Sequence, residues 1–272
     1  MIHPLRDLVL KGAANPPSAY LGVAVVWVGL AALQVAAGGG GFTLPAEARL
    51  AALLSAIGLG TYYVGTLLAL RRGQLSVYYP IIRSSPLAIV GIGWLLLGRT
   101  YSGTAILAII LIVASALLLQ RSPGQLSDDP RATALAGAAM LGSALYSLAD
   151  AHAMQHVGVG VFLFWVYILV SLELGLASLL IEDGSMVQRL ISGWTSAPWR
   201  ILIAALTSYA SYQFILLAFR AGADAAVVSA VRQASIPVSI VLAAIILREP
   251  KFLQRLVWGA LMAIGIAILV RG

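Results

Sequence analysis

Long apolar stretches separated by short polar segments fill this chain. Nine of the stretches are long enough to cross a hydrocarbon core of roughly 30 Å as a helix. Strands of a membrane barrel would alternate polar and apolar residues, and these stretches do not alternate. Because lipid offers the backbone no hydrogen-bond partners, we expect each stretch to be a membrane-spanning helix. The nine expected helices cover 18–36, 50–70, 77–97, 102–119, 131–155, 159–181, 199–219, 223–247 and 254–270.

The composition agrees with a membrane location. Hydrophobic residues make up 61% of the 272 residues, charged residues make up 10%, and the mean hydropathy is +0.96. A soluble domain of this size would need more charge on its surface. The absence of cysteine excludes disulfides and thiol nucleophiles. We therefore expect an all-α, polytopic helical bundle in the inner or plasma membrane of the cell.

The order of features indicates two related halves. Residues 77–119 predict a helix with Arg83 and Pro86, a tight turn and a small-residue helix, and residues 223–270 repeat that order with Arg232 and Pro237. The polar segment 120–130 is the best candidate linker, so we place the first repeat at 1–124 and the second at 125–272. Internal repeats are typical of transporter folds, although two unrelated apolar helical hairpins can also look alike.

The basic residues between spans are unevenly distributed. If the spans alternate in direction, eleven Lys and Arg side chains fall on the side of the N-terminus and four on the other side. An excess of basic residues marks the cytoplasmic side. This distribution predicts a cytoplasmic N-terminal side and a C-terminus on the opposite side. We expect the protein not to bind nucleic acids, because its basic residues are scattered between apolar runs.

Three segments combine polar or charged residues with apolar helix in a recognisable order. They are Arg83-Ser84-Ser85-Pro86-Leu87, Ala144-Leu145-Tyr146-Ser147-Leu148-Ala149-Asp150 and Val231-Arg232-Gln233-Ala234-Ser235-Ile236-Pro237-Val238. These segments resemble helices of the EamA family of the drug/metabolite transporter superfamily. The resemblance implies ten helices in two five-helix inverted repeats around a central cavity. Residues 5–13 look like the end of the family's first helix, so we expect four helices in the first repeat and five in the second. The family usually has a cytoplasmic C-terminus, which opposes the orientation that the loop charges predict.

Ionisable side chains inside spans are costly and usually functional. The four that we expect there are Arg83, Asp150, Glu173 and Arg232. Glu173 and Arg232 fall near the middle of their spans, where they are expected to face the cavity, either paired with each other or in contact with substrate. A structural ion pair between packed helices is the alternative. Arg83 either lines the same cavity or extends to the lipid headgroups.

Other polar residues are expected around this cavity. Tyr146, Tyr212 and Gln233 are predicted to line it, and so is Tyr62. Pro86 and Pro237 each remove a backbone donor and are expected to bend their helices at equivalent places. Asp150 and Glu173 are the candidates for handling a proton. Asp224 is expected to cap its helix, and we expect no metal site or cofactor.

These features favour a secondary active transporter. The resemblance implies export of a small polar or amphipathic metabolite by alternating access, with one repeat rocking against the other and protons as the candidate coupling ion. Membrane lipids are expected partners, and the pattern leaves monomer and homodimer open. The alternative is a non-transporting membrane protein that flips lipids or assists assembly. An intramembrane enzyme is least favoured, because no HExxH motif and no supported Ser/His pair is present.

Overall fold

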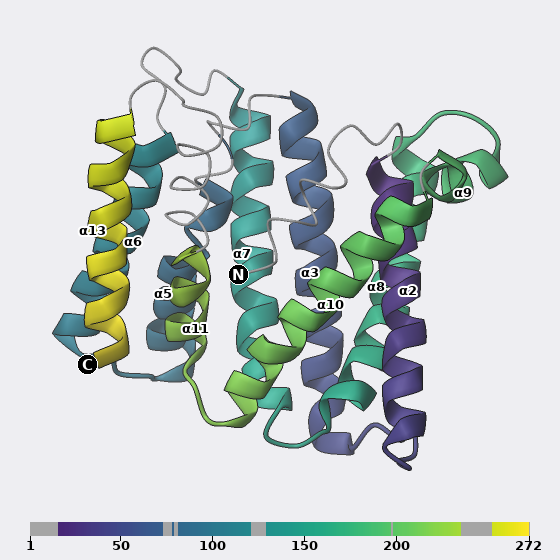
Figure 1. Ribbon diagram of the computed structural model, residues 1–272, viewed down its shortest axis with the longest axis horizontal. Helices are drawn as coiled ribbons and strands as arrows, with labels where there is room; N and C mark the ends of the chain where they lie inside the picture. Colours follow the sequence, from purple (N-terminus) through teal and green to yellow (C-terminus); the bar gives the residue numbers. More distant parts are fainter. Residues whose placement is uncertain are drawn as a thin grey trace.

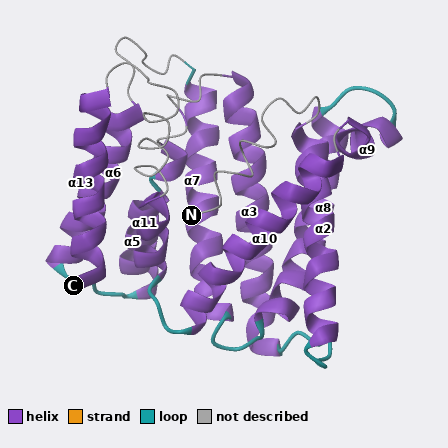
Figure 2. Ribbon diagram, in the orientation of Figure 1, coloured by secondary structure: helices purple, strands orange, loops and turns teal. Residues whose placement is uncertain are grey.

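The structure is a computed structural model that describes residues 16–72, 78, 81–120, 129–196, 198–234 and 252–271. All regular secondary structure in these ranges is helical, and most helices run side by side (Figures 1 and 2). Within the described part of the chain, five helices are long and apolar enough to cross a membrane: α2 (Pro16–Ala37), α3 (Ala46–Arg72), α7 (Pro130–Ala153), α8 (Val159–Ile181) and α10 (Pro198–Arg220). For the described residues, the expectation of a helical fold with several helices of membrane-spanning length is thereby confirmed.

The other expected spans correspond to shorter described helices. These are α5 (Ser85–Leu97), α6 (Gly103–Gln120), α11 (Ala225–Val231) with the 3-10 helix η1 (Arg232–Ala234), and α13 (Phe252–Arg271). The remainder of the expected span 223–247, including Pro237, lies outside the described residues, as does the proposed repeat boundary at 124/125. An additional helix, α9 (Met186–Ser196), packs against α2 at one edge of the molecule.

The expected bend near Pro86 takes the form of an interruption before α5. Residues 81–83 are helical, Ser84 forms a turn, and α5 begins at Ser85 with Pro86 in its first turn. Proline is well tolerated in a first helical turn, where its missing N–H needs no partner. The α5 helix ends at Gly98, whose φ of 61° is left-handed and suits glycine.

The helices pack as two groups. The larger bundle contains α2, α3, α7, α8, α9 and α10, and the smaller bundle contains α5, α6, α11 and α13. Figure 1 shows the larger bundle on the right and the smaller one on the left. The most extensive packing pairs α3 with α7 and α2 with α8 in the larger bundle, and α6 with α13 in the smaller one. Contacts of α5 and α11 with α7, and of α10 with α11, form the seam between the bundles.

Glycines allow the close contact of α3 with α7. A Cβ on Gly58 would lie 2.7 Å from the Tyr146 backbone nitrogen, and a Cβ on Gly142 would lie 2.7 Å from the Gly58 oxygen. These distances leave no room for a methyl group against backbone atoms. The two helices therefore approach as closely as small residues permit, as is common between membrane helices.

Polar contacts at the ends of helices secure each bundle. The Asp224 carboxylate accepts hydrogen bonds from the backbone nitrogens of Ala226 and Val227, so the expected helix cap is confirmed. Asp224 also forms an ion pair with Arg99 at 3.0 Å, within the smaller bundle. Arg71 pairs with Glu182 near the ends of α3 and α8, within the larger bundle.

Candidate functional site

A small polar pocket lies at the seam between the two bundles. Its free volume is about 10 Å³, enough for about one water molecule. From the larger bundle, α3 and α7 supply part of its wall, while residues 82–85, α11 and η1 of the smaller bundle supply the rest. The lining residues are Tyr62, Ile82, Arg83, Ser85, Ser143, Tyr146, Ser229, Arg232 and Gln233.

Arg232 reaches across the seam from η1 to α7. Its Nη1 donates a hydrogen bond of 2.9 Å to the hydroxyl oxygen of Tyr146. The centre of the guanidinium group also lies 5.9 Å from the centre of the Tyr146 ring, which is within the range of a cation–π contact. The Arg232 guanidinium group thus contacts both the hydroxyl group and the ring of one tyrosine.

Gln233 links the two arginine-bearing segments. Its side chain is only 2% exposed, and its Nε2 donates a 3.1 Å hydrogen bond to the backbone oxygen of Arg83. Nearby, the hydroxyl oxygens of Ser85 and Ser229 lie 3.4 Å apart. The Oε1 of Gln233 is buried and accepts no hydrogen bond from any described residue. A buried acceptor without a donor is unfavourable, so this oxygen favours a ligand or water in the pocket.

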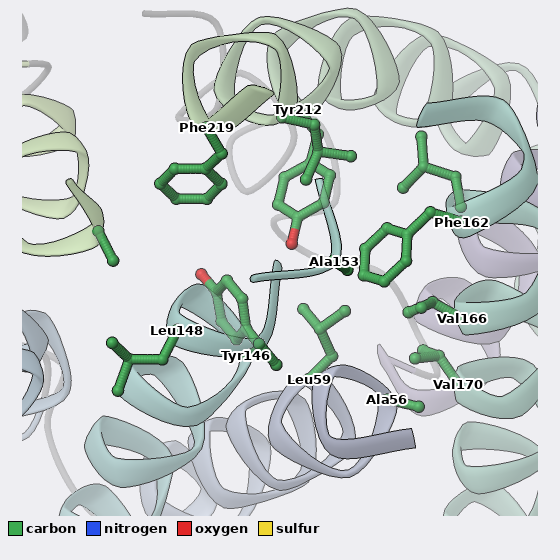
Figure 3. Close-up of a cluster of buried hydrophobic side chains, with 14 of the residues drawn as sticks. Ala56, Leu59, Tyr146, Leu148, Ala153, Phe162, Val166, Val170, Tyr212 and Phe219 are labelled. Atoms are coloured by element: carbon green, nitrogen blue, oxygen red, sulfur yellow. The ribbon is translucent and has the colours of Figure 1, made fainter. Parts of the chain in front are cut away.

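Aromatic rings continue from the pocket into the larger bundle. The Tyr146 ring centre lies 6.1 Å from that of Tyr62 and 6.4 Å from that of Tyr212. Figure 3 shows Tyr146 and Tyr212 pointing their hydroxyl groups into the space between α7 and α10. Trp27 extends the series, because its ring lies 5.5 Å from Tyr212 and 4.2 Å from Tyr167. The pocket therefore borders an aromatic interior.

Asp150 lies beyond the pocket, inside the larger bundle. Its side chain is fully buried, Ser55 donates to its Oδ1 at 2.6 Å, and Tyr212 donates to its Oδ2. One carboxyl group thereby connects α3, α7 and α10. Asp150 does not line the pocket, but Tyr212 contacts both this carboxyl group and the ring of Tyr146.

Glu173 is placed apart from the other predicted site residues. Its carboxyl group lies against Gly60 of α3, at a position where a Cβ on that glycine would overlap it. Its Oε2 is buried without a hydrogen-bond partner among the described residues. Of the two alternatives for Glu173, a pair with Arg232 is not formed: the Glu173 carboxyl group lies against α3, whereas Arg232 donates to Tyr146 of α7. Glycine at position 60 leaves the space that the carboxyl group fills.

The structure thus brings together part of the predicted site. Arg83, Arg232, Tyr146 and Gln233 line one pocket, whereas Asp150 and Tyr212 form a separate cluster beside it and Glu173 lies apart. The serines of the pocket were not predicted: Ser85, Ser143 and Ser229. Helical spacing contained a signal for two of them. Ser229 shares a helical face with Arg232 and Gln233, and Ser143 precedes Tyr146 by three positions. No group of three or more metal-ligating side chains occurs in the described part of the chain.

Comparison with known proteins identifies the fold of this chain but no family. No protein-family model and no curated relative matches the sequence. A crystal structure of another protein aligns with 95% of this chain and 90% of its own chain, with a TM-score of 0.71 and 18% identity. At this identity the likeness concerns the fold alone. The fold is therefore one that experimental structures contain.

Proposed function

We propose that this chain is a secondary transporter of the EamA type, with its substrate site in the pocket between the two bundles. The observation that carries the proposal is the meeting of Arg83 and Arg232 in one pocket. These residues come from equivalent places in the two proposed repeats, and a repeat interface is where transporter folds place their substrate sites. Charged side chains inside a membrane bundle are costly, which favours a functional reason for keeping two of them there.

The packing of equivalent helices supports two inverted repeats and nine spans. In the proposed alignment, α2 corresponds to α8, α3 to α10 and α6 to α13. The members of each pair run in opposite directions (Figure 1), as inversion requires. Two of the pairs, α2 with α8 and α6 with α13, also pack against each other, which is expected for elements beside a two-fold pseudo-symmetry axis. In this alignment α7 is the first helix of the second repeat, and it corresponds to the first helix of the family's first repeat.

The sequence led us to expect that one repeat rocks against the other, but the packing of the helices favours a movement between the two bundles. Each bundle contains helices of both repeats, since α3 packs on α7 and α6 packs on α13. Moving one whole repeat against the other would separate these extensive contacts. Rocking one bundle against the other would instead disturb only the seam, where the pocket lies. We therefore propose that alternating access is a movement between the two bundles.

Export, proton coupling and a cell-membrane location complete the proposal. Asp150 is the candidate coupling group, because its carboxyl group is joined through Tyr212 to the Tyr146 side of the pocket. Protonation of this carboxyl would change the hydrogen bond to Tyr212 and thereby the contact of Tyr212 with Tyr146. The excess of basic residues on the side where α2 begins supports a cytoplasmic location for that side.

A transport screen tests the proposal. Vesicles containing the purified protein are given a mixture of labelled organic acids, amino acids, sugars and amines, with and without a pH gradient. We expect protein-dependent movement of at least one compound, and a loss of at least tenfold in rate for Arg232→Gln and for Arg83→Gln. Arg220→Gln, an exposed arginine at the end of α10, is the matched control and should transport at the wild-type rate.

Wild-type transport rates in both pocket variants would show that the substrate site lies elsewhere. Movement of labelled phospholipid between leaflets, without movement of any soluble compound, would instead favour a lipid-flipping protein.

A further inference from the structure

The pocket has an unusual combination of charge and hydrogen-bonding groups. Both of its charged lining residues, Arg83 and Arg232, are cationic, and no acidic side chain is among its described lining residues. A guanidinium group has five N–H donors in a planar fork, so an arginine that already bonds to a tyrosine can also bind an anion. The electrostatics of the pocket therefore favour a ligand with negative charge.

Gln233 requires a hydrogen-bond donor on the ligand, in addition to the negative charge that the arginines favour. Its buried Oε1 is an acceptor that no described residue satisfies, while its Nε2 is already bonded to the Arg83 backbone oxygen. The amide is fixed in this orientation, since rotating it by 180° would bring its oxygen against the oxygen of Arg83. A ligand that fits this place must offer a hydrogen-bond donor to Oε1 beside its anionic group.

We propose that the pocket binds a small organic acid with a hydroxyl group next to its carboxylate, and this inference rests on the proposed transport site. The carboxylate lies between the two guanidinium groups, where paired N–H···O bonds are strong. The hydroxyl donates to Oε1 of Gln233. An ammonium group in the same place could donate as well, but the two arginines would repel its positive charge. The site therefore selects hydroxy acids over amino acids.

The free volume of the pocket fits only about one water molecule in this conformation. An organic acid thus enters when the bundles move apart at the seam. This requirement agrees with the placement of the pocket, since residues on both sides of the seam would close around the ligand.

Three probes with the same three-carbon skeleton test the inference. Lactate has a carboxylate and a hydroxyl, propionate lacks the hydroxyl, and alanine has an ammonium instead. Their binding to the purified protein in detergent is measured by calorimetry at constant ionic strength. We expect lactate to bind roughly threefold to tenfold more tightly than propionate, the effect of one hydrogen bond, and alanine to bind more weakly than propionate.

Gln233→Met isolates the role of the amide oxygen. The methionine has a similar size but no acceptor of comparable strength. We expect it to abolish the preference for lactate while leaving propionate affinity unchanged. Arg232→Gln should weaken both anions, and Arg220→Gln should weaken neither. If Gln233→Met does not fold, the order of the affinities of lactate, propionate and alanine for the wild-type protein still tests the inference.

Equal binding of alanine and lactate, or no binding of either anion, would overturn the inference. A preference for lactate that persists in Gln233→Met would overturn it as well. The binding assay in detergent tests the ligand class, and the vesicle assay tests the transport function. Because binding in detergent needs no transport, the two proposals can fail independently. Transport of a cation without lactate binding would contradict only the ligand class, whereas lactate binding without transport of any compound would contradict the proposed function.

Discussion

At the scale of single residues, the interior is organised by tyrosine hydroxyl groups. Tyr146 accepts a hydrogen bond from Arg232 on the pocket side, and Tyr212 donates to Asp150 on the other side. The rings of the two tyrosines are neighbours. Two ionisable side chains, the fully buried Asp150 and the partly buried Arg232, are thus each hydrogen-bonded to one member of this tyrosine pair.

Removing one hydroxyl tests how far Asp150 depends on it. Tyr212→Phe removes one hydrogen bond to Asp150 and leaves the one from Ser55, so we expect a loss of about 1–3 kcal/mol in the free energy of unfolding. Tyr209→Phe on the same helix is the control. Its hydroxyl donates to Gln34 at an exposed site, and that glutamine keeps its contact with Gln213, so the loss should be below about 0.5 kcal/mol. Chemical or thermal unfolding in detergent measures both, and equal losses would contradict this role of Tyr212.

The sequence identified the pocket arginines because an ionisable residue in an apolar run is conspicuous. The same reasoning could not choose between a pairing of Glu173 with Arg232 and a contact of each with substrate, since the depth of a residue along its span does not say which neighbouring helix it faces. The pocket serines were missed for the opposite reason. Serine is common in membrane helices, where its hydroxyl often bonds to the backbone one turn earlier, as Ser147 does to Ser143.

At the scale of helices, the contact between α3 and α7 depends on glycine. Because the Cβ of an alanine at position 142 would meet backbone atoms of α3, Gly142→Ala should force the helices apart and cost about 1–3 kcal/mol. Gly137→Ala on the same helix is the matched control. A Cβ there meets nothing within 4 Å, so this change should be neutral or stabilise by up to about 1 kcal/mol.

Thermal unfolding in detergent compares the two variants directly. Equal stability of Gly142→Ala and Gly137→Ala would show that α3 and α7 are not as close as the structure places them. Gly142→Ala should also weaken lactate binding, because Ser143 and Tyr146 of the pocket lie on the same helix.

Apolar length predicted the helices well but not their interruptions. The expected spans 159–181 and 199–219 match α8 and α10 almost residue for residue. In contrast, the span expected at 77–97 is broken at Ser84, and the 3-10 turn that bears Arg232 follows a helix of only seven residues. Proline signals a possible interruption, but only the packing of neighbouring helices decides where the backbone departs from the helix.

At the scale of the whole molecule, the arrangement of the repeats could not be read from their order. A linker at 120–130 suggests two halves that fold beside each other, yet each bundle draws helices from both halves. The glycines of α3 and α7 signal that each helix has a close neighbour, but not which helix that neighbour is. The location of the pocket follows from this mixing of helices from the two halves, because the segments with Arg83 and Arg232 meet where the smaller bundle faces α7.

The movement of the two bundles is the central claim, and spin-label distances test it most directly. The chain has no cysteine, so introduced cysteines label only the chosen positions. Exposed leucines supply two pairs with one member in each bundle, on either side of the seam. These seam pairs are Leu50→Cys near the start of α3 with Leu97→Cys at the end of α5, and Leu117→Cys near the end of α6 with Leu180→Cys near the end of α8. Leu33→Cys with Leu50→Cys stays within the larger bundle as the control.

In lipid, with and without a compound that the transport screen identifies, we expect the distance of one seam pair to lengthen while that of the other shortens, and the control distance to remain constant. Seam distances that stay unchanged while the same labelled protein transports the compound, or that both change in the same direction, would contradict alternating access between the two bundles.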